Sequence, residues 1–198
     1  MESKKIKCWI FAVAAIALQI GAVAFILLRT QSIKKDAYEN GRIILMECTA
    51  RDPYNPFKGR YAKLTLVEEN PHPSFTDVEG VKYKGKVYCT LKKDDDGIFR
   101  ISTISSTMPE DGRVFIQASL NYSYKNESGE TACELGFNFD EYYMQENHAL
   151  HLDSLQTEDF NALNPRLELY VDKNGRCIQK ELYLAGLPLA DYMAVNVR

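Results

Sequence analysis

Two hydrophobic patterns divide this chain. Residues 9–28, WIFAVAAIALQIGAVAFILL, contain no charged side chain and one strongly polar residue, Gln19. Beyond residue 40, apolar and polar residues alternate with a period of two in short runs, the pattern of strands with one buried face. The runs that we expect to be strands are 42–49, 61–68, 86–93, 98–105, 114–124, 132–139, 167–172 and 176–184. The chain is therefore predicted to be mainly β after a helical N-terminus.

The N-terminal apolar run has the length of a transmembrane helix. At about 1.5 Å of rise per residue it spans about 30 Å, the thickness of the hydrocarbon core of a bilayer. A cleaved signal peptide is the alternative, because three lysines precede the run and Ala22-Val23-Ala24 resembles a cleavage site. The run continues through Leu28, however, and this length favours an uncleaved anchor.

The expected organisation follows from this anchor. Residues 1–8 form a cytoplasmic tail, 9–28 the transmembrane helix, 29–40 a juxtamembrane linker and 41–198 an extracytoplasmic β domain. Basic residues flank the apolar run on both sides and give no orientation by themselves. The short basic tail is typical of a signal anchor, which predicts a single-pass protein of the cell membrane with its C-terminal domain outside the cytoplasm.

Turn residues refine the predicted domain. The sequences DDDG (94–97) and DKNG (172–175) lie between alternating runs, and glycine or asparagine adopts the positive φ of tight hairpins. A looser third hairpin is expected at NESGE, 126–130, and one short helix over 153–163 with Ser154 as its cap. The predicted fold is a compact antiparallel β domain, a barrel or a sandwich, with one short helix.

Composition and charge narrow the function. The chain has 198 residues, of which 45% are hydrophobic and 26% charged, which fits one globular domain with an appendage. The whole chain has 27 acidic and 24 basic side chains. One acidic residue, Glu2, and four basic residues lie around the predicted span: Lys4, Lys5, Lys7 and Arg29. Without them, the domain has 26 acidic and 20 basic side chains, a net charge of −6. An acidic domain without a basic stripe argues against nucleic acid as a partner.

Two groups of residues are candidates for a binding site. The first is a loop rich in proline and aromatic residues just before the strand at 61–68, and it is either a rigid corner of the fold or a ligand or partner site. Its candidate residues are Arg51, Asp52, Tyr54, Phe57, Arg60 and Tyr61. The second candidate cluster consists of Tyr142, Tyr143 and Glu146.

Catalytic and metal signals are weak. His148 and His151 are three residues apart near Glu146, but no third strong ligand completes a known metal motif. No nucleophile signature such as G-x-S-x-G is present. We therefore predict no cofactor, no metal site and no catalytic residues. Four cysteines of the domain are expected to be free and buried rather than paired in disulfides: Cys48, Cys89, Cys133 and Cys177.

The chain resembles the bacterial GDYXXLXY family over residues 41–186. The resemblance lies in Asp52-Pro53, Gly59, Tyr61 and Leu64, in the aromatic segment FNFDEYYMQE and in the closing segment VDKNGRCIQKELYLAG. Two motif positions differ, because Arg60 stands where the family has aspartate and Leu66 where it has tyrosine. Arginine neither coordinates a metal nor acts as a base, so no such role carries over to residue 60.

The resemblance implies an accessory or assembly role. Members of this family are membrane-anchored proteins without an established activity, and they are often encoded beside multi-pass membrane proteins. We expect a non-catalytic interaction or assembly module whose partner is a multi-pass membrane protein. The alternative is a membrane-anchored hydrolase or metal-dependent enzyme that uses the carboxylate and histidine cluster within 134–153, including Glu134, Asp140 and Glu146.

Overall fold

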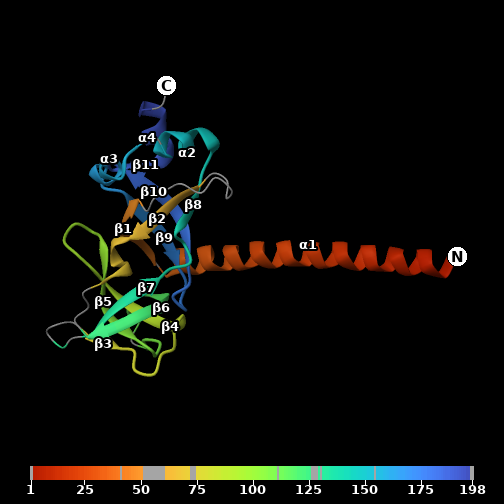
Figure 1. Ribbon diagram of the computed structural model, residues 1–198, viewed down its shortest axis with the longest axis horizontal. Helices are drawn as coiled ribbons and strands as arrows, with labels where there is room; N and C mark the ends of the chain where they lie inside the picture. Colours follow the sequence, from red (N-terminus) through yellow and green to blue (C-terminus); the bar gives the residue numbers. More distant parts are fainter. Residues whose placement is uncertain are drawn as a thin grey trace.

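A computed structural model describes residues 2–40, 42–50, 61–71, 75–110, 112–125, 129, 131–153 and 155–196. One long helix, α1 (Glu2–Glu39), projects from a β domain as a single rod (Figure 1). Its part Trp9–Glu39 contains an 18-residue window with a mean hydropathy of 2.6, and none of that window is buried by the rest of the protein. The helix is therefore long and apolar enough to cross a bilayer once.

The strands in the described part of the domain form two sheets. The six-stranded sheet has the order β11-β10-β9-β1-β2-β8 and the five-stranded sheet the order β3-β5-β4-β6-β7. Every paired strand is antiparallel to its neighbour except β3, which runs parallel to β5. The bounds are β1 Ile43–Ala50, β2 Tyr61–Leu66, β3 Phe75–Asp77, β4 Gly85–Lys93, β5 Phe99–Ser105, β6 Phe115–Lys125, β7 Thr131–Gly136, β8 Glu141–Tyr143, β9 Arg166–Val171, β10 Cys177–Leu184 and β11 Leu187–Pro188.

One hydrophobic core joins the two sheets. Alternate residues of β1 and β9, such as Ile44, Met46 and Leu169, pack with Val87 of β4 and Ile116 of β6, and each is at most 1% exposed. Val, Ile and Leu at every second position supply the apolar face that each sheet needs. The mainly β fold predicted from the alternation is therefore confirmed.

The predicted strands and hairpins correspond closely to the observed ones. All eight expected runs contain a strand, and β4–β5 and β9–β10 are antiparallel pairs joined at 94–97 and 172–175. The strands β6 and β7 also pair antiparallel across 126–130. Three strands were not expected: β3, β8 and β11 have only two or three residues, too few for an alternation to be recognised.

Short helices cover one end of the domain. The expected single helix over 153–163 is wrong in number, because α2 (Glu146–Asp153) ends where it should begin and α3 (Thr157–Ala162) occupies its second half. A 3-10 turn, η1 (Val67–Glu69), follows β2, and α4 (Leu189–Asn196) closes the chain. Helices this short are stabilised by packing, here through buried Leu152, Phe160 and Met193.

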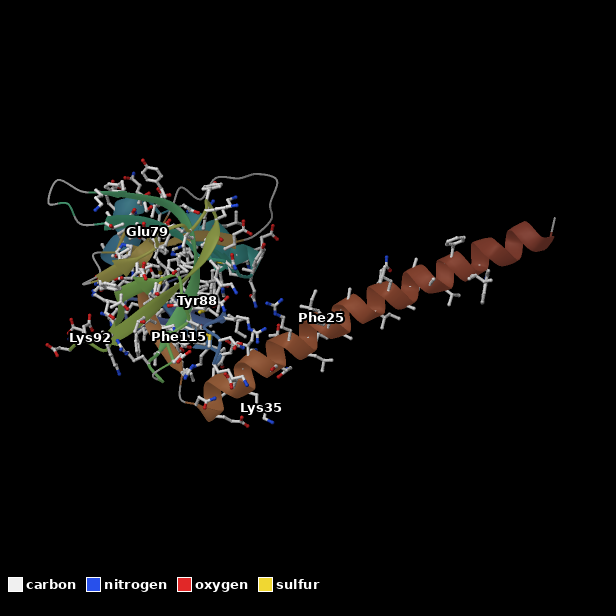
Figure 2. The ribbon with its side chains drawn as sticks, turned by 90° about the horizontal axis from the view of Figure 1, so that it is seen from below. Phe25, Lys35, Glu79, Tyr88, Lys92 and Phe115 are labelled. Carbon is white, nitrogen blue, oxygen red and sulfur yellow. The ribbon has the colours of Figure 1, made fainter. Side chains whose placement is uncertain are left out.

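The segment 29–40, expected to be a juxtamembrane linker, is the last part of α1 up to Glu39 and ends in a turn at Asn40. Its apolar residues Ile33 and Ala37 are 4% and 0% exposed and pack against Tyr170 of β9. The helix therefore passes from its apolar stretch to the surface of the domain without a break. Figure 2 shows this region from below, with Phe25 on the stretch of α1 that leaves the domain.

Candidate functional site

The first candidate loop lies almost wholly outside the described residues. Arg51, Asp52, Tyr54, Phe57 and Arg60 all belong to that part of the chain. Tyr61 begins β2, and its backbone pairs with Tyr143 of β8. The prediction that this loop binds a ligand or a partner therefore remains a prediction.

The second candidate cluster is not one surface. Tyr142 packs against the core, and its hydroxyl donates to Glu181 Oε1 over 3.3 Å. Burial raises the pKa of Tyr142 to about 12. Tyr143 is 67% exposed and donates instead to Glu141 Oε2 over 2.8 Å. Successive residues of a strand face opposite sides, so the structure separates these two tyrosines, and Glu146 lies on α2 beyond them.

The carboxylates and histidines of 134–153 are also spread out. Glu134 is exposed on β7. Asp140 immediately precedes β8, and its backbone carbonyl accepts a hydrogen bond from Leu64 N of β2 over 2.7 Å. His151 of α2 packs beside Tyr192 of α4, with ring centroids 6.4 Å apart. Within the described part of the chain, no three His, Cys, Asp or Glu side chains come together as a metal site would require.

The four domain cysteines are free in the structure, as predicted. Cys48, Cys89 and Cys133 are buried in the core and Cys177 is half-buried. Burial raises the pKa of all four thiols, that of Cys48 to about 12. A buried thiol that stays protonated is a poor nucleophile, so these residues act as small core side chains.

Arg100 on β5 links the two sheets through three carboxylates. Its Nη2 lies 2.8 Å from Glu47 Oε2 on β1, Nη1 lies 3.5 Å from Glu68 Oε1 and Nε lies 3.3 Å from Asp94 Oδ2. Glu68 is 6% exposed, and its other oxygen accepts the backbone N–H of Ile101 over 2.8 Å. A buried carboxylate that is paired and hydrogen-bonded in this way holds strands in register, and we assign this cluster a structural role.

Three exposed tyrosines gather beside β6, and we call them the tyrosine surface: Tyr83, Tyr122 and Tyr124. They are 73%, 61% and 51% exposed, and the rings of Tyr122 and Tyr124 stack with centroids 5.9 Å apart. A shallow groove of about 250 Å³ runs between Tyr83 and Tyr122. The hydrogen bond from Lys84 N to Leu120 O, 2.8 Å long, fixes the loop that carries Tyr83 against β6.

A β-bulge in β6 turns Tyr122 and Tyr124 outward. Leu120 of β6 pairs with Leu135 of β7, and Tyr122 pairs with Glu134, the neighbour of Leu135 in the chain. Two steps along β6 therefore correspond to one step along β7. One extra residue in β6 reverses the face on which the following side chains lie. Directly opposed residues share a face, so Tyr122 stands with exposed Glu134 rather than with buried Leu120. This surface could not be predicted from the sequence, because a bulge leaves no mark on the alternation itself.

The joint between α1 and the domain is the second notable feature. The hydroxyls of Tyr38 and Tyr170 are 2.8 Å apart, and the Asp36 carboxylate accepts a hydrogen bond from Lys173 N. The ammonium groups of Lys34 and Lys180 lie 5.9 Å and 5.8 Å from the centre of the Tyr170 ring. Burial and the hydrogen bond to Tyr38 raise the pKa of Tyr170 to about 12. Together these contacts hold the helix on β9 and β10.

The protein combines one apolar N-terminal helix, long enough to cross a membrane, with a two-sheet β domain to which this helix is fixed. The chain belongs to the GDYXXLXY protein family, whose model matches residues 19–182. The match begins inside α1 and ends in β10, so it includes the joint, the five-stranded sheet and all of the six-stranded sheet except β11 and the end of β10. Leu66, which replaces the tyrosine of the family motif, is 4% exposed in the core. Neither the curated proteins nor the solved structures contain a match to this chain.

Proposed function

We propose that the chain is a non-catalytic interaction or assembly module, anchored in the cell membrane by α1, whose β domain binds another membrane protein outside the cytoplasm. The observation that carries this proposal is the tyrosine surface. Tyrosine is enriched in protein interfaces because it combines a large apolar ring with a polar hydroxyl. A shallow groove rimmed by tyrosines fits a protein surface better than it fits a small substrate.

The attachment of the β domain to α1 supports a partner in the same membrane. A protein confined to a bilayer meets its neighbours at a high effective concentration, so weak contacts suffice for binding. The packing of Ile33 and Ala37 against Tyr170 fixes the domain on the helix. A domain held in one position on the helix samples fewer orientations of the tyrosine surface, so less entropy is lost when a partner binds.

The proposed orientation rests on the resemblance of the basic tail, with Lys4, Lys5 and Lys7, to that of a signal anchor. Protease treatment of intact spheroplasts carrying a C-terminal epitope tag tests it. We expect the tag to be removed without lysis, whereas a tag protected until the cells are lysed would place the domain in the cytoplasm.

Photo-crosslinking in intact cells tests the partner. A photoreactive phenylalanine analogue at Tyr122 should form one discrete adduct with a membrane protein, identified by mass spectrometry. The matched control carries the analogue at Asp96, an exposed position in the turn between β4 and β5. The same adduct from both positions, or no adduct from Tyr122, would contradict the assignment of this surface.

A double substitution, Tyr122→Thr with Tyr124→Thr, tests the same surface by copurification. Threonine keeps a high strand propensity, and substitutions at exposed sites usually change stability by about 0.5 kcal/mol or less. Loss of two interface aromatics should lower partner recovery by about tenfold or more. A parallel variant with Tyr54, Phe57 and Arg60 changed to alanine tests the predicted loop and shows which of the two surfaces makes the contact.

The alternative, a membrane-anchored hydrolase or metal-dependent enzyme, requires the acidic and histidine side chains of 134–153 to converge on a substrate. Glu134 stands beside Tyr122 on the outer face of the sheet, whereas His151 lies at the helical end of the domain. No arrangement in the described residues favours this second function.

A further inference from the structure

A pocket of about 320 Å³ lies in the corner between α1 and the β domain. On the helix side it is lined by Phe25, Ile26, Arg29 and Thr30, and on the domain side by Asn138 and Arg176 among others. Asn138 belongs to the turn after β7, and Arg176 to the connection between β9 and β10. The pocket thus has one wall from the proposed anchor and one from the domain.

The depth of this pocket matches the boundary between acyl chains and headgroups. The uncharged run of α1 ends at Leu28, and each headgroup layer is about 5–7 Å thick. At about 1.5 Å per residue, that layer extends over roughly three to five residues beyond Leu28. Phe25 and Ile26 therefore lie at the level of the acyl chains, whereas Arg29 and Thr30 lie at the level of the phosphates.

The charge of the pocket is positive at that level. Arg29 is exposed on α1, and Arg176 faces it from the domain with Asp172 as its partner. Asp172 Oδ2 lies 2.6 Å from both Nε and Nη2 of Arg176. A guanidinium has five N–H donors, so Arg176 retains capacity for another acceptor. Two arginines against one carboxylate leave a net charge of +1, which matches one phosphodiester.

We propose that this junction pocket binds an anionic phospholipid, with its phosphate between Arg29 and Arg176 and an acyl chain against Phe25 and Ile26. Arginine binds phosphate oxygens through charge-assisted hydrogen bonds, and the side chains of Thr30 and Asn138 add neutral donors at the same depth. A soluble phosphate would use only the polar half of the pocket. The lipid fills both halves. The inference rests on α1 crossing the bilayer and is independent of the proposed partner at the tyrosine surface.

Native mass spectrometry of the full-length protein in neutral detergent tests the proposal. The probes are dioleoyl phosphatidylglycerol and dioleoyl phosphatidylcholine, which have the same acyl chains and differ in net charge. We expect one phosphatidylglycerol molecule to be retained under conditions that remove phosphatidylcholine. Equal retention of the two lipids would overturn the proposal.

Two variants test the two walls separately. Arg29→Gln removes the helix charge and Asn138→Asp places a carboxylate on the domain side; both positions are exposed, so the fold should persist. Each should weaken phosphatidylglycerol binding by about five- to tenfold. If Asn138→Asp had no effect, the lipid would belong to a general shell around the helix, and the pocket assignment would be wrong.

Lys35→Gln is the matched control. It removes the same charge from the same helix, but Lys35 lies roughly 240° around the axis from Arg29 and points away from the domain (Figure 2). We expect less than about a twofold change in lipid binding, because a charge outside the pocket acts only through the screened surface potential. An equal loss in Lys35→Gln and Arg29→Gln would show nonspecific attraction and overturn the proposal.

Glycerol 1-phosphate distinguishes a lipid from a free phosphate. It presents the same phosphate without acyl chains and should not displace phosphatidylglycerol at millimolar concentration. Displacement would assign the pocket to a soluble anion instead. The crosslink from Tyr122 should persist in Arg29→Gln, so that failure of the lipid proposal and failure of the proposed function give different results.

Discussion

Replacing Gly175 by alanine should reveal how strongly the turn between β9 and β10 is docked on the five-stranded sheet. Gly175 has a φ of +78°, and its carbonyl accepts the N–H of Gln117 on β6 over 2.7 Å. A Cβ at this position would lie 2.7 Å from Cε2 of Phe115 and 3.2 Å from the backbone N of Gln117. Phe115 is only 3% exposed, so its ring has little room to move away.

The expected cost has two parts. A side chain at positive φ costs about 1 kcal/mol relative to glycine, and forcing an extra methyl into a packed site costs about 1–3 kcal/mol. Gly175→Ala should therefore lower the free energy of unfolding by about 2–4 kcal/mol. Gly186 has nearly the same φ, +80°, but an added Cβ there meets nothing within 4 Å. Gly186→Ala should therefore cost only about 1 kcal/mol.

Equilibrium urea unfolding of the full-length protein in detergent, followed by near-ultraviolet circular dichroism of the tyrosines, measures both variants. The difference between them isolates the steric part, because both carry the same backbone penalty. If the two free energies of unfolding agreed within about 0.5 kcal/mol, the docking of the turn on Phe115 would not be a significant contribution to stability.

Three further predictions concern the joint and its neighbouring turn. Tyr38→Phe removes the 2.8 Å hydrogen bond to Tyr170 and should destabilise the joint by about 1 kcal/mol, seen as faster amide exchange over residues 33–40 with unchanged exchange in the core. The pKa of Tyr170 is raised to about 12, above its unfolded value near 10. Its contribution to stability is therefore complete below about pH 10 and is lost as the pH rises toward 12. Over this pH range the free energy of unfolding should fall less steeply in Tyr170→Phe than in the unchanged protein, and an equal slope would contradict the assignment. Asp172 is 2% exposed and accepts hydrogen bonds from the backbone N–H groups of Asn174 and Arg176 over 2.9 and 2.8 Å. Asp172→Asn should therefore lower the urea midpoint of unfolding by an amount equivalent to about 2 kcal/mol. An unchanged midpoint would show that the negative charge of Asp172 does not stabilise the turn.

Much of the fold could be predicted from local patterns. An uncharged run of 20 residues ending at Leu28 has few alternatives to a spanning helix. Alternating runs with Val, Ile, Tyr and Thr predicted eight of the strands, and DDDG and DKNG predicted their hairpins. These features depend on residues close together in the chain, and their physical rules are local.

The candidate site was less accessible to sequence reasoning. The neighbours Tyr142 and Tyr143 looked like one cluster, but the pleat of β8 sends one into the core and leaves the other exposed. The junction pocket combines Arg29 with Arg176, which are 147 positions apart, so no local pattern could join them. The docking of Ile33 and Ala37 on Tyr170 likewise required the path of the whole sheet.

Local sequence patterns are sufficient to predict that an apolar helix precedes a β domain and where most strands and hairpins lie, because helix length, period and turn chemistry depend on residues close together in the chain. Which side chains reach the surface depends on how the strands pair in the folded protein. The clearest case is β6, where Ile116, Ala118 and Leu120 are buried and simple alternation would bury Tyr122 as well. The bulge opposite Glu134 reverses that face, because register depends on the partner strand and not on the strand alone.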